Sequence, residues 1–185
     1  MDVLSLQIPE VRLVRPQVHG DSRGFFLEVW NRERYAALGM DRPFVQLNHS
    51  RSGRGTLRGL HFQWTRPQGK LVRLISGQVF DVAVDLRPDS PTFGRWAGHL
   101  LNAENQEQLW IPERFAHGFC VLSPHADFEY LCTEPYQAQD EGVLRWNDPE
   151  IGVAWPLADP LLSDKDRAAP LLAELRERLQ RAWSA

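Results

Sequence analysis

Four side chains in this sequence have types and spacing that suit proton transfer beside a bound anion. The segment 57–63 has the pattern of a short strand and contains Arg58 and His61. Lys70 follows shortly after it, and His117 lies much later between aromatic residues. Histidine exchanges protons near neutral pH, and the two cations stabilise negative charge on a ligand or transition state. We therefore look for chemistry first around segment 57–63.

Metal binding is one interpretation of this spacing. Residues 55–77 follow the spacing of the first cupin signature, in which the metal ligands are His-x-His and then Glu. Here Gln63 stands in place of the second histidine, and Lys70 stands in place of the acidic ligand. An ammonium group has no lone pair and repels a cation. We therefore expect no metal at this site.

Acid–base catalysis is the competing interpretation, and the lysine favours it. A positive charge next to His61 disfavours the imidazolium and leaves a neutral base, while the same charge of Lys70 stabilises an enolate. Nucleophilic catalysis by Cys120 or Cys132 has no comparable support, because neither lies in a nucleophile motif. Their apolar surroundings predict buried free thiols, which suit a reducing cytoplasm.

The composition narrows the class of protein. A chain of 185 residues with 43% hydrophobic residues suits one domain spanning residues 1–185. A formal charge of −3 is too balanced for a nucleic-acid binder that neutralises many phosphates. No stretch approaches the roughly 18 apolar residues of a membrane helix, and residues 1–4 do not begin a signal peptide. We expect a cytoplasmic protein without nucleic-acid or membrane partners.

The elements that position these residues are mostly short strands. Glycine, proline and asparagine recur at short intervals between runs rich in Val, Leu, Phe and Trp, a rhythm typical of an antiparallel sandwich or barrel. Helical spacing is limited to a short segment at 32–38 and to the tail at 168–183. The sequence therefore predicts a mainly β fold with short helices and a C-terminal helix.

Alternation along a strand decides which side chains share a face. It places His61 on the same face as Gln63, and Asp81 on the same face as Asp85. Arg58 points away from His61 in a regular strand, whereas a bulge at the intervening glycine would turn it inward. Both orientations of Arg58 stay open, and the two aspartates are read as buried hydrogen-bonding groups.

Eight ordered stretches of the chain resemble the dTDP-4-dehydrorhamnose 3,5-epimerases of the cupin superfamily, over about residues 8–172. The stretches are GDSRGFFLE (20–28), LRGLHFQ (57–63), QGKLV (68–72), VFDVAVDLR (79–87), SPTFG (90–94), FAHGF (115–119), WNDP (146–149) and LSDKD (162–166). The resemblance implies a cupin-type antiparallel jelly-roll barrel. It also implies a cofactor-free homodimer that epimerises a dTDP-4-keto-6-deoxyhexose in L-rhamnose or related deoxysugar biosynthesis.

The same resemblance implies four catalytic residues. By comparison with the family, His61 removes the protons next to the ketone and Asp166 pairs with it. Lys70 stabilises the enolate, and Tyr130 returns a proton from the opposite face. A phenol with an ordinary pKa of about 10 suits protonation of a basic enolate carbon. Asp166 has an alternative role as a cap of the terminal helix.

Further positions match substrate-binding residues of the family. Arg23, Arg58 and His117 correspond to contacts with the diphosphate or sugar, and arginine suits paired phosphate oxygens. Tyr136 corresponds to a residue that stacks on thymine. The remaining nucleotide and sugar contacts are Glu28, Gln46, Asn48, Glu141 and Lys165. The strand with Glu28 is expected to reach the site of a partner subunit.

The sequence leaves two other functions open and departs from the family at three positions. Relatives that epimerise one carbon only are not separated by these motifs, and a non-catalytic sugar-nucleotide-binding cupin would retain the arginines. Arg114 stands where relatives usually have glycine, so it strains the turn if a positive φ is required. Leu47 replaces an acidic residue and Leu131 a basic one, which puts substrate detail in doubt.

Overall fold

Antiparallel strands form most of the computed structural model, which describes residues 1–184. The strands are β1 (Asp2–Ser5), β2 (Arg12–Arg15), β3 (Val18–Asp21), β4 (Gly24–Leu27), β5 (Gln46–Gly53), β6 (Leu57–Gln63), β7 (Lys70–Ser76), β8 (Gln78–Asp85), β9 (Trp96–Asn102), β10 (Gln108–Ile111), β11 (Phe115–Val121), β12 (His125–Cys132) and β13 (Glu141–Val143). The helices are α1 (Arg32–Ala37), α2 (Asp164–Arg167), α3 (Leu172–Trp183) and the 3-10 helix η1 (Ala138–Asp140). The mainly β, antiparallel prediction is confirmed.

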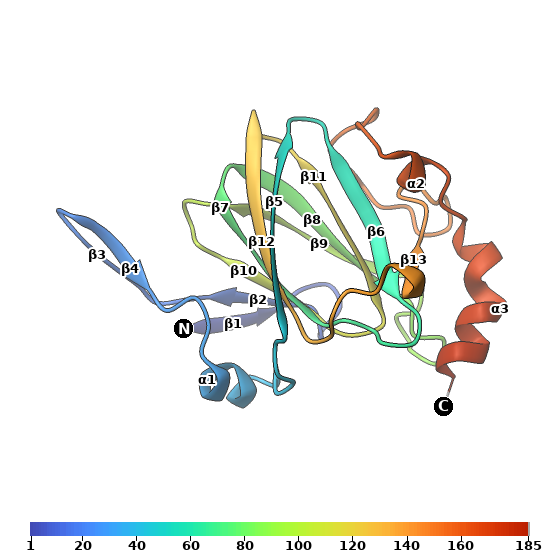
Figure 1. Ribbon diagram of the computed structural model, residues 1–185, viewed down its shortest axis with the longest axis horizontal. Coiled ribbons are helices and arrows are strands. Elements are labelled where there is room, and N and C mark those ends of the chain that lie inside the picture. Colours follow the sequence, from blue (N-terminus) through green and yellow to red (C-terminus); the bar gives the residue numbers. More distant parts are fainter. Residues whose placement is uncertain (185) are drawn as a thin grey trace.

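Two sheets face each other and enclose the core (Figure 1). One sheet has the order β1-β2-β10-β7-β12-β5, and the other has the order β13-β6-β11-β8-β9. Buried apolar side chains from both sheets pack together between them. For example, the ring of Phe119 on β11 stacks on the ring of Phe128 on β12, with the ring centroids 4.1 Å apart. Burying one such side chain contributes about 1.5–3 kcal/mol to folding.

The polar residues predicted to do chemistry lie on the same inward faces as this core. Tyr130 is two residues beyond Phe128 on β12, and Lys70 is two residues before Val72 on β7. Because alternate residues of a strand share a face, the core side chains fix the direction of the polar ones. The barrel therefore has an apolar interior that continues into a polar one along the same strands.

Helix α3 covers the outer face of the smaller sheet (Figure 1). Its apolar side chains recur at helical spacing, and Leu172, Leu179 and Trp183 are buried against residues of that sheet. The indole N–H of Trp183 donates to the carbonyl of Trp64 at 2.8 Å. The predicted helix at 168–183 begins later, at Leu172, because Pro170 disfavours helical backbone at the residue before it.

The hairpin of β3 and β4 extends away from the barrel (Figure 1). Every residue in its two strands except Leu27 is exposed, and Phe25 and Phe26 are 62% and 71% exposed. A two-stranded hairpin without a covered face is only marginally stable in water. Its apolar side chains are therefore suited to contact with another surface.

Two further expectations concern cysteines and membrane spans. Cys120 and Cys132 are both buried and unpaired, as predicted. Burial raises the pKa of the Cys120 thiol to about 11, so it stays protonated at neutral pH. Among residues 1–184, no helix is long and apolar enough to cross a membrane.

Candidate active site

A hydrogen-bonded pair of His61 on β6 and Asp166 on α2 forms the centre of the site. Nε2 of His61 lies 2.6 Å from Oδ1 of Asp166. The imidazole is 25% exposed, whereas the carboxylate is almost completely buried at 3%. Burial alone would raise the pKa of Asp166, but hydrogen bonds from His61 and Ser163 hold it below its usual value. Because Nε2–H is engaged, Nδ1 of His61 is the nitrogen left to act as a base.

The orientation of Arg58 is settled by a bulge in β6. His61 pairs with His117 of β11, but the register shifts before Arg58 pairs with Phe119. Gly59 sits at this shift with a φ of 133°, where a Cβ would lie 2.5 Å from Cα of Gly118. Arg58 therefore lines the same cavity as His61, and the bulge interpretation is confirmed.

A second histidine–aspartate pair lies beside the first. Nε2 of His117 lies 2.9 Å from Oδ2 of Asp81, which is completely buried. Burial lowers the pKa of His117 despite the attraction of Asp81, and the charge of Lys70 lowers it further. Asp85, on the same face of β8, instead binds Arg87 and neighbouring hydroxyl groups. The two aspartates thus differ, since Asp81 supports a side chain of the cavity and Asp85 holds a loop.

Lys70 and Tyr130 approach the cavity from the opposite sheet. Lys70 lies at the start of β7 and is 8% exposed, and burial lowers the pKa of its ammonium group. Tyr130 lies on β12, and burial raises the pKa of its phenol. The shifts have opposite directions because burial favours the neutral form of each group. Both groups line the cavity with His61.

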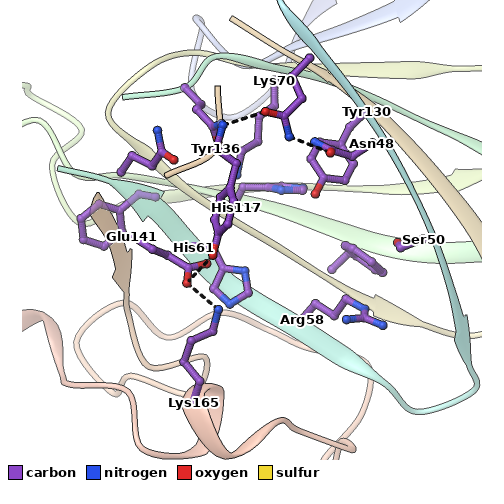
Figure 2. A pocket seen from close by; sticks show the side chains of 15 residues that line it. Asn48, Ser50, Arg58, His61, Lys70, His117, Tyr130, Tyr136, Glu141 and Lys165 are labelled. Carbon is purple, nitrogen blue, oxygen red and sulfur yellow. Dashed lines mark hydrogen bonds and ion pairs between the residues drawn. The ribbon is translucent and has the colours of Figure 1, made fainter. Parts of the chain in front are cut away.

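The cavity has a volume of about 310 Å³, and ten of the thirteen predicted site residues line it, as Figure 2 shows for most of them. Asp166 lies behind His61 and does not line the cavity itself. Hydrogen bonds connect the polar side chains that line the cavity. Lys165 donates to Glu141 at 2.7 Å, and the backbone N–H of Tyr136 donates to Gln46 at 2.8 Å. Gln46 in turn donates to Asn48 at 2.8 Å. These hydrogen bonds hold charged, amide and aromatic groups around the cavity.

Arg23 and Glu28 do not lie at this cavity. Arg23 is exposed in the projecting hairpin, where it forms an ion pair with Asp21. Glu28 follows the hairpin and forms an ion pair with Arg34 at 3.2 Å, while its Oε1 atom is buried without a hydrogen-bond partner in residues 1–184. Within one chain, these two predicted binding residues are therefore separated from the others.

Several residues that line the cavity were not predicted from the sequence. Ser50 lies two positions beyond Asn48 on β5, so alternation along the strand was a sufficient signal for it. Gln63 also lines the cavity, but its amide is bound to the carbonyl of Arg66 and to the N–H of Gln137. No sequence signal indicated these bonds, because the partners come from loops without a regular pattern.

The donor set does not fit a metal centre. Within the described part of the chain, no group of three or more His, Cys, Asp or Glu side chains could hold an ion. His61 and His117 each bind an aspartate, and Lys70, whose ammonium group has no lone pair for a metal, lines the same cavity. The arrangement instead supplies a base, a cation and a phenol.

Comparison with known proteins matches this geometry to one family. The family model described as dTDP-4-dehydrorhamnose 3,5-epimerase matches residues 5–174. The chain belongs to this family. It is 55% identical over 179 residues to the enzyme of that name from Neisseria gonorrhoeae, covering 94% of this chain but only about half, 53%, of that relative. It is 54% identical to the Pseudomonas aeruginosa relative, covering 94% of this chain and 97% of that one.

A solved structure supports the same assignment. The epimerase from Legionella pneumophila, in complex with dTDP-4-keto-L-rhamnose, superposes with a TM-score of 0.95 at 47% identity and covers 100% of this chain and 99% of that chain. The predicted cupin-type jelly roll, the enzyme class and the family resemblance are therefore confirmed.

The three departures from the family pattern lie outside the lining of the cavity. Leu47 and Leu131 are direct cross-strand neighbours on β5 and β12, and neither lines the cavity. The two replacements therefore form one apolar cross-strand pair outside the lining of the cavity. Arg114 has a φ of 65°, so the turn before His117 does carry a strained non-glycine residue.

Proposed function

We propose that this chain catalyses the cofactor-free 3,5-epimerisation of dTDP-4-keto-6-deoxy-D-glucose to dTDP-4-keto-L-rhamnose. The observation that carries the proposal is the His61–Asp166 pair in one cavity with Lys70 and Tyr130. Membership of the epimerase family and the sugar nucleotide bound by the Legionella relative support it. The activity belongs to deoxysugar biosynthesis in the cytoplasm, carried out by one domain.

The reaction begins with proton removal from carbon. Nδ1 of His61 takes the proton from C3 or C5, each next to the C4 ketone, and the C–H electron pair moves into the enolate. Asp166 holds the imidazole in the required tautomer and stabilises the imidazolium that forms. The ammonium group of Lys70 stabilises the negative oxygen. Tyr130 then gives its proton to the carbon from the opposite face, which inverts the centre.

The cations of the cavity suit the diphosphate of the substrate. Arg58 donates through Nε to Ser52 at 3.0 Å, which leaves the two terminal nitrogens of its fork for phosphate oxygens. Lys165 and His117 line the same cavity and serve as further contacts for the sugar nucleotide in this proposal. The half-exposed ring of Tyr136 stacks on the thymine base in this proposal. The amides of the strand β5 and Glu141 serve as further sugar and nucleotide contacts.

A homodimer accounts for the two predicted residues that lie away from the cavity. The projecting hairpin carries Arg23 and leads to Glu28, and it exposes Phe25 and Phe26 to solvent in the single chain. Docking of this hairpin on a second copy would bury its aromatic side chains and bring Arg23 to the partner's anionic ligand. We therefore propose that two copies of the chain form a dimer in which each β3–β4 hairpin docks on the other copy.

Substitution Arg23→Ala is expected to raise KM about tenfold with little change in kcat, because one charged hydrogen bond to the diphosphate is lost. Co-expression with His61→Asn tests whether the hairpin acts in trans. In the mixed dimer, the intact His61 site receives the intact hairpin, so a population with the original KM reappears. If the mixture retains only the raised KM, Arg23 does not act across the dimer.

Substitution Lys70→Met is expected to lower kcat by roughly a hundredfold, since the enolate loses its positive partner. It also changes the pH profile. Burial lowers the pKa of Lys70 and raises that of Tyr130, so we expect loss of the lysine charge to set the alkaline limb of kcat. The alkaline loss of kcat therefore lies below the usual pKa of lysine and moves to higher pH in the variant. An unchanged alkaline limb would assign it to another group.

The function itself is tested by deuterium uptake. The protein is incubated with dTDP-4-keto-6-deoxyglucose in D2O, and NMR follows the label at C3 and C5. Label at both carbons with formation of the L-sugar is expected. Label at one carbon would indicate a single-carbon epimerase, and absence of label would overturn the catalytic proposal in favour of a binding protein.

A further inference from the structure

The two carboxylate oxygens of Asp166 have different partners. Oδ1 lies 2.6 Å from Nε2 of His61, and Oδ2 accepts a hydrogen bond from the hydroxyl of Ser163 at 2.8 Å. The oxygen of that hydroxyl also accepts the backbone N–H of Asp166 at 3.1 Å. Ser163 thus contacts both the main chain and the carboxylate of the residue that holds the base.

We propose that Ser163 is a positioning residue for the reaction, which acts on His61 through Asp166. The hydrogen bonds form a continuous chain from the hydroxyl of Ser163 through the carboxylate to the imidazole. This inference rests on the proposed epimerase function, because it gives the serine a role in the same proton transfer. The role goes beyond capping of helix α2.

Because Asp166 is buried, its Oδ2 atom needs the hydrogen bond from the hydroxyl of Ser163. Only 3% of the side chain is exposed, so water does not reach the carboxylate freely. Buried polar groups require partners within the protein. Among the described residues, His61 and Ser163 are the side chains that hydrogen-bond to this carboxylate. Together they offset the effect of burial, and the pKa of Asp166 stays below its usual value. Without Ser163, Oδ2 has no such partner.

The chain around Ser163 is tied to the strand that carries His61. Leu161 accepts a hydrogen bond from the N–H of Leu57 at 3.0 Å and donates to Gly55 at 2.8 Å, so it pairs with the start of β6. Ser163 follows as the N-cap of α2, a helix of only 4 residues. So short a helix has little stability of its own. The anchored serine therefore fixes the place of Asp166 relative to the imidazole.

Other ionisable groups also act on the imidazole, and they come from every element around it. The charged and titratable side chains that share the cavity with His61 are Arg58, Lys70, His117, Tyr130, Tyr136, Glu141 and Lys165. A substitution of Ser163 leaves all of these groups in place. A shift of the pH profile in such a variant is therefore attributable to the hydrogen-bond chain through Asp166.

Three substitutions separate positioning from capping. Ser163→Ala removes the hydroxyl and the cap, whereas Ser163→Gly removes the hydroxyl but retains most of the capping stability, and Ser163→Thr retains both. We expect kcat to fall about tenfold in the alanine and glycine variants, because a hydrogen bond to a charged group is lost. KM is expected to stay the same, and the threonine variant should recover activity.

The pH dependence gives the readout that a purely structural role would not change. With Oδ2 unpaired, the carboxylate attracts the proton of His61 more strongly, so the acidic limb of kcat moves to higher pH. Proton–nitrogen NMR of the imidazole in the substrate-free protein, assigned with His61→Asn, should show the same upward shift. This NMR measurement does not depend on turnover, so it tests the inference even if the wild-type protein proves inactive. Unchanged kcat and titration in Ser163→Gly would overturn it and leave Ser163 as a helix cap.

Discussion

Substitution His61→Asn is expected to lower kcat by roughly a thousandfold or more and to abolish deuterium uptake at both C3 and C5. A positioned general base contributes a factor of about 10² to 10⁴ to the rate. Among the described residues that line the cavity, His61 is the one whose imidazole hydrogen-bonds to a carboxylate of α2. Asparagine has a similar size, and its amide can still donate to the buried carboxylate of Asp166. The loss should therefore reflect proton transfer and not disruption of the fold.

The second histidine of the cavity supplies the matched control. His117 is also held by an aspartate, but it is only 6% exposed, and its carboxylate partner Asp81 lies within the barrel. We expect His117→Asn to weaken binding of dTDP and to retain deuterium uptake at a reduced rate. If His117→Asn abolishes uptake while His61→Asn retains it, the roles of the two histidines are reversed. Thermal unfolding of both variants checks that the barrel is intact.

The parts of this site that depend on strand alternation were predictable from the sequence. Alternation put His61 and Gln63 on one face and Asp81 with Asp85 on another, and the structure agrees. The reason is that each side chain's direction follows from its neighbours along the same strand, whose apolar members must face the core. Even the inward turn of Arg58 had a local signal, the glycine that follows it.

The parts that depend on contacts between distant segments were not predictable in the same way. Asp81 was read only as a buried hydrogen-bonding group, and its support of His117 follows from the pairing of β8 with β11. Ser163 and Asp166 have the Ser-x-x-Asp spacing of a helix N-terminus, but this spacing did not indicate that the hydroxyl donates to the carboxylate. The direction of the hairpin with Arg23 was also undetermined, because a hairpin with no buried face carries no alternation that fixes where it packs.

The resemblance to a family supplied what alternation could not. Tyr130 on its own has the pattern of a core aromatic residue, and it packs beside Phe128 with ring centroids 6.0 Å apart. Nothing in the spacing of its strand distinguishes a phenol that donates a proton from one that fills the interior. Its role in this chain therefore remains a proposal, and it calls for a direct test.

Substitution Tyr130→Phe is expected to lower the rate of inversion more than a hundredfold while deuterium uptake continues. His61 is unchanged, so it still removes a proton and, after exchange with D2O, returns a deuteron to the face it came from. The substrate thus gains label without becoming the L-sugar, as NMR of the substrate would show. Burial raises the pKa of Tyr130, so the wild-type phenol keeps its proton throughout the neutral range and is available as the acid.

The phenylalanine variant is not expected to disturb the fold, so a loss of inversion would reflect the loss of the proton donor. In residues 1–184 no hydrogen bond holds the Tyr130 hydroxyl, so its removal leaves no buried partner unsatisfied, and little change in Tm is expected. Tyr136 at the rim is the alternative acid, and Tyr136→Phe serves as the matched control that should retain inversion. Normal inversion by Tyr130→Phe would refute its role, whereas uptake without inversion would separate proton removal at His61 from proton return at Tyr130.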